Sequence, residues 1–357
     1  MSWFLTFGGF AALIILHEFG HFAAAKAVGM RVERFALFFP PLLFKMRRGE
    51  TEYGIGAIPL GGYVRITGMN PNEELDPAIA HRAYYRQPVW KRIVVISAGP
   101  LMNVLVAFAI LWGLFAIKGV PEATNSVARA DLRQPAAAVL RPGDRIVAVD
   151  GRRGGPQAIR AQISRHRCAG AQRNGCRAAT PAGVTVSRGG RLRTFSITPR
   201  YDAAAGRPRI GFAFGSRFRP VGAGEAASLS VTGMWRVAKG TVSAIGRIFD
   251  AKQRKQISGV VGTSDALKHS IDFGVSDALT VLAIISLSLA IVNLFPFLPL
   301  DGGHIFWALA EKVRGRVIPF SVMERASVVG FALVIMLFFI GLTNDIGRLR
   351  GEGFGPR

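Results

Sequence analysis

The hydrophobic pattern of this chain is dominated by long apolar stretches. Runs without a charged side chain cover residues 1–16, 93–117, 278–300 and 326–344. A helix of about 20 apolar residues crosses the hydrocarbon core of a bilayer. The pattern therefore predicts membrane helices near residues 3–28, 93–117, 278–299 and 325–343. It excludes an ordinary water-soluble enzyme.

The first apolar run has an alternative interpretation as a secretory signal peptide. Such peptides begin with a basic segment and end at a small-residue cleavage site. This run has neither feature, and it carries His17, Glu18 and His21. We therefore favour a retained membrane helix.

Residues 29–92 and 302–324 are expected to form loops between predicted helices, and their charges indicate the orientation of those helices. The basic residues after the first helix and between the third and fourth are Arg31, Arg34, Lys45, Arg47, Arg48, Lys312, Arg314, Arg316 and Arg325. Lys and Arg in short loops favour the cytoplasmic side, so we expect an outside N-terminus and an extracytoplasmic segment 118–277. The protein is then a multi-pass membrane protein.

Composition adds a strong basic balance, with 45 Lys+Arg against 22 Asp+Glu and a net charge of +23. Most of the excess lies in segment 118–277, where we expect it near anionic lipid head groups. Nucleic acid is not an expected partner, because no reading motif accompanies the charge. The sequence defines no oligomeric state.

The extracytoplasmic segment has the pattern of strands and turns. Alternating residues follow a Pro-Gly-Asp turn in 140–151, and residues 184–188 and 192–198 flank Gly189-Gly190, a hairpin signal. Residues 209–214 suit a final strand. An apolar stripe in 224–249 predicts an amphipathic helix on the membrane surface; the alternative is packing on the external domain.

The first predicted helix contains His17-Glu18-Phe19-Gly20-His21, an HExxH pattern. Residues four apart lie on one helix face, so both imidazoles can reach one Zn²⁺. Glu18 lies beside that position and suits a general base. The alternative is hydration of these side chains at a helix end, but ionisable residues inside a membrane are usually functional.

A catalytic zinc takes a third protein ligand, and the end of the third run offers one. There two prolines interrupt the helix between Asn293 and Asp301. Asp301 can supply an oxygen ligand, with His304 as a lower-ranked rival. Asn293 can donate hydrogen bonds to a substrate backbone or an oxyanion.

Together these motifs resemble the site-2 protease family of intramembrane zinc metalloproteases, in its RseP-like branch. The resemblance rests on HExxH paired with N-x-x-P-x-x-x-x-D-G and spans nearly the whole chain. It implies that His17, His21 and Asp301 hold zinc, that Glu18 is the catalytic acid and base, and that Asn293 contacts substrate. The run Gly99 to Asn103 matches the family's G-x-x-x-N element, and we assign Asn103 to substrate binding.

The same resemblance implies the remaining architecture, a polytopic α-helical membrane protein of about four transmembrane helices. It also implies a place in the bacterial inner membrane, with the active site towards the cytoplasmic side. Residues 53–63 resemble a membrane-reentrant β-loop that adds a strand to the extended substrate, with Gly54, Ile55 and Gly56 as contacts. Residues 122–216 resemble one extracytoplasmic PDZ domain (α+β). The expected divisions are 1–117 with HExxH, 122–216, 224–270 as surface helix and connector, and 277–345 with the Asn-Pro-Asp-Gly motif.

Cys168 and Cys176, the two cysteines of the chain, flank a turn-rich segment. A disulfide is favoured outside the cytoplasm; the alternative is two free thiols.

The leading hypothesis is therefore a zinc metalloendopeptidase acting on single-pass membrane proteins, such as anti-sigma factors or remnant signal peptides. The alternatives are a membrane zinc carrier or sensor and an inactive PDZ scaffold. Glu18 disfavours a carrier, which needs no base beside its ligands.

Overall fold

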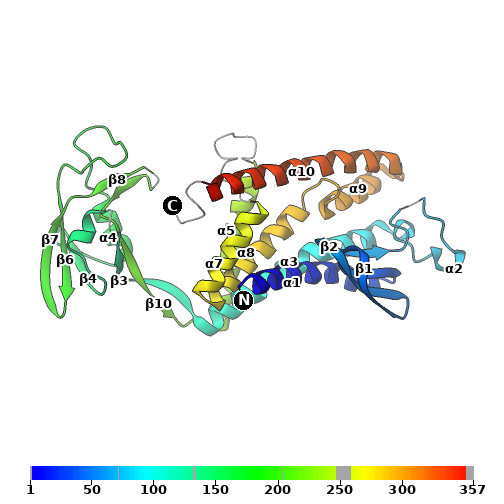
Figure 1. The fold of residues 1–357 in the computed structure, drawn as a ribbon, viewed down its shortest axis with the longest axis horizontal. Coiled ribbons are helices and arrows are strands. Elements are labelled where there is room, and N and C mark those ends of the chain that lie inside the picture. The colour runs from blue at the N-terminus through cyan, green and yellow to red at the C-terminus, as the bar shows by residue number, and fades with distance from the viewer. Residues whose placement is uncertain (1, 71, 132–133, 204, 247–258, 351–357) are drawn as a thin grey trace. The chain divides into compact units, whose positions relative to one another are not determined.

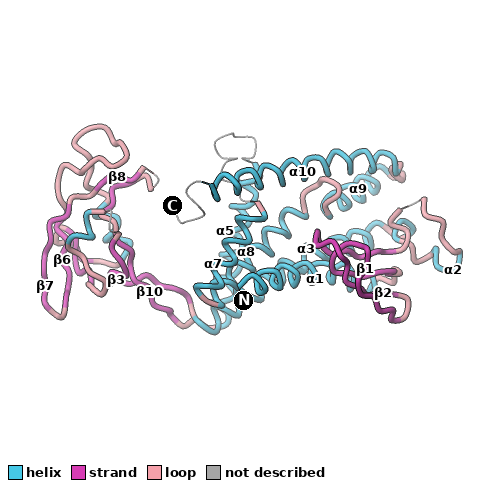
Figure 2. Tube along the Cα trace, viewed as in Figure 1, coloured by secondary structure: helices cyan, strands magenta, loops and turns pink. Residues whose placement is uncertain are grey.

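The computed structural model describes residues 2–70, 72–131, 134–203, 205–246 and 259–350 (Figure 1). The chain divides into two compact units. One comprises Met1–Leu114 and Ala223–Arg357, and the other comprises Phe115–Gly222. Figure 2 shows that the first unit is mainly helical and that the second consists mainly of strands and loops.

Four helices of the first unit are long and apolar enough to cross a membrane. These are α1 (Ser2–Ala27), α3 (Val89–Lys118), α8 (Val275–Asn293) and α10 (Phe320–Arg350). The prediction of four membrane helices is confirmed in number and place. Many of their large apolar side chains are exposed, including Phe331 and Leu101, as expected for surfaces that face lipid rather than water.

The third predicted helix is shorter than expected, and the loop after it is largely helical. α8 ends at Asn293, and α9 (Asp301–Arg314) begins after an irregular segment. Pro296 and Pro299 lie in that segment, where a proline lacks the N–H that a continuing helix requires. The prediction of a loop over 302–324 is therefore wrong for its first half, which belongs to α9.

A β-hairpin follows α1. It is formed by β1 (Val32–Arg48) and β2 (Thr51–Ile66), which pair in antiparallel fashion with several register shifts. The first half of β1 pairs with both ends of β2, so the sheet is wider than two strands. In spatial order its segments are 42–48, 51–56, 32–37 and 62–66. The short helix α2 (Pro77–Ala80) and a 3-10 turn at Tyr84–Arg86 complete the connection to α3.

The second unit is built around one antiparallel sheet with the strand order β10-β3-β4-β6-β7. Its elements are β3 (Val120–Ala130), β4 (Arg145–Val149), β5 (Arg152–Arg153), α4 (Pro156–Ile163), β6 (Ala182–Arg188), β7 (Arg191–Ile197), β8 (Arg200–Asp202), β9 (Arg207–Arg209) and β10 (Phe212–Arg219). Alternate residues of β6, Val184 and Val186, are fully buried in its core with Ile146 and Ile159. The expected strands over 140–151 and the hairpin at Gly189-Gly190 are present, whereas the final strand begins later, at Phe212.

The helices α5 (Ala223–Gly246) and α7 (Val260–Phe273) belong to the first unit. α5 packs on α8, where the hydroxyls of Thr241 and Ser288 lie 3.3 Å apart. The last part of the predicted stripe, including Phe249, lies outside the described residues. Placement of α5 at a membrane surface stays a prediction.

Candidate metal centre

Helix α1 presents His17 and His21 from successive turns of one face. Their Nε2 atoms are 3.3 Å apart, and both residues are buried. The spacing of four residues produces this approach, because positions i and i+4 of a helix lie one above the other. Glu18, the next residue along, points to a different side of the helix.

Asp301 joins the two imidazoles from the first residue of α9. Its Oδ2 atom lies 3.3 Å from Nε2 of His17 and 3.4 Å from Nε2 of His21. Residues some 280 positions apart in the chain thus bring three ligand atoms together in a nearly equilateral triangle. Within the described part of the chain, these three residues are the group of His, Cys, Asp or Glu that could hold a metal ion, and His304 is not a member.

The donor set fits a tetrahedral zinc ion. Bonds of about 2.0–2.1 Å to nitrogen and oxygen place tetrahedral ligands about 3.3–3.4 Å apart, which is the spacing in this triangle. Asp301 Oδ2 is buried and has no hydrogen bond of good geometry among the described residues. A buried polar atom without a partner is costly, and a cation at the centre of the triangle would satisfy it.

Helix α3 contacts both imidazoles at their Nδ1 atoms, opposite the Nε2 atoms of the ligand triangle. Nδ1 of His21 lies 2.9 Å from the carbonyl oxygen of Val95, and Nδ1 of His17 lies 3.1 Å from the side-chain amide of Asn103. Asn103 is fully buried. It therefore lies beneath His17 and not at the surface, and substrate contact by Asn103 stays a prediction.

The two helices approach closely enough for these contacts because glycines line their crossing. A Cβ atom at Gly99 would lie 2.2 Å from Nε2 of His21, and one at Gly20 would lie 2.3 Å from the carbonyl oxygen of Ala98. Real Cβ contacts are never this short. Any larger residue at either position would separate α1 from α3 or displace the His21 ring.

The last part of β2 covers Glu18. The backbone of Val64 lies close to the Glu18 carboxylate, and a Cβ atom at Gly62 would lie 2.7 Å from Glu18 Cγ. Segment 62–66 forms an outer edge of the hairpin sheet. The edge of a sheet therefore runs directly past the carboxylate that adjoins the three ligands.

The expected contacts Gly54, Ile55 and Gly56 lie in β2. Gly54 pairs with both Ala36 and Lys45, and Ile55 pairs with both Leu37 and Phe44, whereas Gly56 pairs with Leu42. Gly54 and Ile55 therefore have a strand on each side. Substrate contact by residues 54–56 stays a prediction, and the outer edge of the sheet beside Glu18 is segment 62–66.

Asn293 lies at the metal centre, as the motif predicts. Its Nδ2 atom is 3.4 Å from Nε2 of His17, at the last residue of α8. The side chain is only partly buried. This placement leaves the amide next to the ligand triangle and within reach of a bound molecule.

A buried ion pair, which sequence analysis did not identify, anchors the helix that carries Asp301. Arg92 of α3 donates two hydrogen bonds, of 3.0 and 2.6 Å, to the carboxylate of Glu311 on α9. The two side chains are only 11% and 20% exposed. Arg92 adjoins a long uncharged run and Glu311 lies in an expected loop, so the sequence alone gave no reason to pair them.

Ion pairs at the hairpin turn fasten the sheet to α1. Glu50 accepts from Arg82 at 2.7 Å and from Lys26, at the end of α1, at 2.5 Å. The Arg82 hydrogen bond, with that of Lys26, lowers the pKa of Glu50 to about 2 against the partial burial that would raise it. The charged form of Glu50 therefore helps to hold the hairpin in place.

In the second unit, Cys168 and Cys176 are joined in a disulfide. It closes the turn-rich segment between α4 and β6.

Comparisons with known proteins agree with this arrangement. The family model of peptidase family M50 matches residues 5–337. Zinc metalloprotease Rip1 of Mycobacterium tuberculosis (strain ATCC 25618 / H37Rv) is 31% identical over 386 residues, which cover 94% of this chain and 92% of that protein. Rip1 of Mycobacterium bovis (strain BCG / Pasteur 1173P2) matches to the same extent. A relative from Rhizobium meliloti (strain 1021), also named as a zinc metalloprotease, is 30% identical over 364 residues, with 95% and 94% of the two chains covered.

Proposed function

The chain belongs to peptidase family M50, the site-2 protease family that its motifs resemble, and we propose that it is an intramembrane zinc endopeptidase. It hydrolyses peptide bonds in or near the transmembrane segments of single-pass membrane proteins. The observation that carries this proposal is the triangle of His17, His21 and Asp301 with Glu18 beside it. Two of the ligands and Glu18 lie on a helix apolar enough to cross a membrane.

The chemistry follows from the roles of the side chains. Zinc held by His17, His21 and Asp301 supplies a Lewis acid that polarises a carbonyl and makes water more acidic. Glu18 accepts a proton from the attacking water as its oxygen bonds to the scissile carbonyl carbon. Glu18 then passes that proton to the leaving nitrogen as the C–N bond breaks. Asn293 donates hydrogen bonds to the substrate from the edge of the triangle.

Substrate presentation uses the free edge of the hairpin sheet. A helical peptide hides its carbonyls in its own hydrogen bonds, so a transmembrane substrate must unwind before water can attack. An extended segment can be held open by pairing with an exposed strand edge. Segment 62–66 is such an edge and runs past Glu18, so pairing there would bring the unwound bond to the base.

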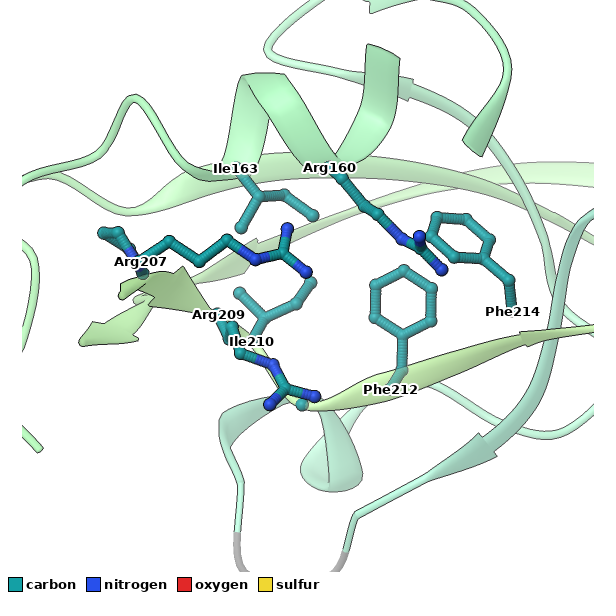
Figure 3. Close-up of a pocket in the computed structure, with 9 residues that line it drawn as sticks. Arg160, Ile163, Arg207, Arg209, Ile210, Phe212 and Phe214 are labelled. Atoms are coloured by element: carbon teal, nitrogen blue, oxygen red, sulfur yellow. The ribbon is translucent and has the colours of Figure 1, made fainter. Parts of the chain in front are cut away.

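The second unit selects substrates outside the cytoplasm, as a PDZ domain near anionic lipid head groups. A cavity of about 200 Å³ lies between α4 and the β9–β10 segment of this unit (Figure 3). Phe212 and Phe214 contribute aromatic rings, and Arg160 lies 5.0 Å from the centre of the Phe214 ring. With Arg207 and Arg209 on the same cavity, the lining suits an extended segment that carries negative charge. Anti-sigma factors already trimmed outside and remnant signal peptides are the substrate classes that this scheme accommodates.

Cleavage of membrane reporters tests the proposal. Two single-pass reporters differ only at the middle of their transmembrane helix, with an Asn-Pro pair in one and Leu-Leu in the other. Because proline costs a helix interior about 3 kcal/mol, we expect purified protein in vesicles to cleave the Asn-Pro reporter at least about tenfold faster. Chelation of zinc, or Asp301→Asn, abolishes the cleavage.

The same assay separates the other hypotheses. A wild-type protein that contains zinc, cleaves neither reporter and moves zinc across the vesicle membrane supports a carrier. A wild-type protein without zinc supports an inactive scaffold. Cleavage of water-soluble peptides alone contradicts an intramembrane site.

A further inference from the structure

One face of α3 contacts all the ligand-bearing elements of the metal centre. Arg92, Val95, Gly99 and Asn103 follow a spacing of three, four and four residues, which places them on one side of a helix. Arg92 pairs with α9, Val95 accepts from His21, Gly99 admits the His21 ring and Asn103 meets His17. This face of α3 therefore orients His17 and His21 directly and Asp301 through α9.

The partner of His21 fixes which of its nitrogens carries the proton. A backbone carbonyl oxygen only accepts hydrogen bonds, so Nδ1 of His21 must donate to Val95. Its Nε2 atom, which points into the triangle, then keeps a lone pair for a metal. Backbone geometry alone holds His21 in the form that a metal requires.

His17 has no such carbonyl, and its Nδ1 partner is the Asn103 amide. An amide can meet a ring nitrogen with its NH₂ group or with its oxygen. The NH₂ group, 3.1 Å away, requires a bare Nδ1 and so puts the proton on Nε2, which faces Asp301 at 3.3 Å. That tautomer places the proton on the nitrogen that faces the ligand triangle, so it leaves no lone pair for an ion.

The oxygen of the Asn103 amide offers a second arrangement, in which Nε2 of His17 keeps its lone pair. Oδ1 of Asn103 is buried and has no hydrogen-bond partner among the described residues. A half-turn of the amide about its last side-chain bond exchanges Oδ1 and Nδ2. Oδ1 then accepts from Nδ1–H of His17, and Nε2 is free to bind. The hydroxyl of Ser286 on α8 donates to the backbone oxygen of Asn103 at 2.9 Å; this contact involves the main chain only and is the same for either orientation of the amide.

We propose that Asn103 is a positioning residue whose side-chain oxygen selects the metal-binding tautomer of His17. It acts through His17 and does not touch substrate. The inference rests on the proposed function to the extent that His17 is a zinc ligand, and it replaces the substrate contact expected for Asn103. A partner that orients a metal-bound imidazole in this way typically changes metal affinity by 10- to 100-fold when removed.

Zinc affinity of full-length protein in detergent, measured by competition with a chromophoric chelator, tests the inference. Asn103→Leu keeps the size of the side chain and removes both hydrogen-bonding groups, so we expect a loss of at least about tenfold. Asn103→Asp keeps an oxygen that only accepts, and we expect affinity close to that of wild type. Ser286→Ala is the matched control, because it removes a buried hydrogen bond to the same residue without changing the atom that faces His17; its affinity should stay close to wild type.

Unfolding of each variant in excess chelator shows whether the metal-free fold is retained. Wild-type affinity in Asn103→Leu overturns the inference, and so does an Asn103→Asp protein that binds zinc as weakly as Asn103→Leu with an unchanged unfolding midpoint. If Asn103→Leu does not fold, the comparison of Asn103→Asp with wild type decides. Because affinity is measured without substrate, a protein that binds zinc but cleaves no reporter contradicts the proposed function and not the role of Asn103.

Discussion

At the scale of single residues, the metal centre depends on its ligand side chains and on the glycines that let α1 and α3 approach each other. The HExxH spacing was sufficient to predict that His17 and His21 share a helix face, and the Asp-Gly pair after a broken helix indicated Asp301. The support from α3 was not predictable. Sequence shows that Gly99 and Asn103 are four residues apart, but the helix crossing that brings them against the imidazoles is tertiary.

Gly99→Ala tests the close approach of α1 and α3. The added Cβ atom would lie 2.2 Å from Nε2 of His21, so the ring must move away from the other two ligands. We expect zinc affinity to fall by more than about tenfold and cleavage to fall with it. Gly113→Ala on the same helix is the control, because nothing lies within 4 Å of its added Cβ. Equal zinc affinity in the two variants would show that the crossing of α1 and α3 accommodates the added Cβ atom without displacing His21.

At the scale of elements, hydropathy predicted the membrane helices but misjudged the segment between the last two. Residues 302–324 have charges that favour a loop, yet α9 occupies 301–314, and its Ile305 packs against a buried cluster that includes Val95 of α3. Glu311 is tolerated there because Arg92 neutralises it, and such pairing is invisible in a sequence. Residues 53–63, which resemble a membrane-reentrant β-loop, lie in β2 of the hairpin; their reentrant placement stays a prediction. The register of the sheet, which decides which edge is free, required the structure.

The Arg92–Glu311 pair should stabilise the position of α9. Removing one partner leaves a nearly buried charge, and such changes cost on the order of 3 kcal/mol. We expect Glu311→Ala and Arg92→Ala to lower the unfolding midpoint and to weaken zinc binding through Asp301. The double substitution to leucine should recover part of the stability. Arg65→Ala, which removes a half-exposed arginine from its pairs with Glu33 and Glu73, should cost less than about 1 kcal/mol.

Glu50 makes the docking of the hairpin dependent on pH. Its pKa in the folded protein is about 2, below the ordinary 4.5, so its stabilising contribution is complete above pH 4.5 and is lost as pH falls towards 2. After correction for the intrinsic pH dependence of amide exchange, the protection of amides in β2 against hydrogen exchange should therefore fall over that interval. In Glu50→Gln the same amides should exchange faster at neutral pH and change less on acidification. Glu122→Gln, which alters an exposed pair with Arg217, should leave β2 exchange as in wild type. An identical pH response in Glu50→Gln would assign the effect to other groups.

At the scale of the whole molecule, long uncharged runs were enough to define a membrane protein with a separate β-rich unit. Four helices have the length and composition to cross a bilayer, and residues 115–222 form their own compact unit around a buried aliphatic core. The boundaries of the expected domain, 122–216, fall inside that unit. The orientation of the chain rests on loop charges alone, and it remains a prediction.

Site-directed labelling tests that orientation. In a chain with Cys168 and Cys176 replaced by serine, Gln172→Cys places a thiol on the exposed disulfide loop of the second unit, and Asn70→Cys places one on an exposed turn before α3. A membrane-impermeant maleimide applied to spheroplasts of an expressing bacterium should label Gln172→Cys at once and Asn70→Cys only after lysis. The opposite order would invert the proposed topology. It would also remove the reason to expect a disulfide, which forms in oxidising compartments.

The most direct test of the central claim is Glu18→Gln, with zinc content and reporter cleavage measured on the same vesicles. Glu18 is not among the three ligands, so the variant should hold as much zinc as wild type. Without a base to accept the proton of water, its cleavage rate should fall by at least about 100-fold. Equal cleavage by Glu18→Gln and wild type would contradict the mechanism, because the carboxylate beside the metal centre would then have no part in the reaction.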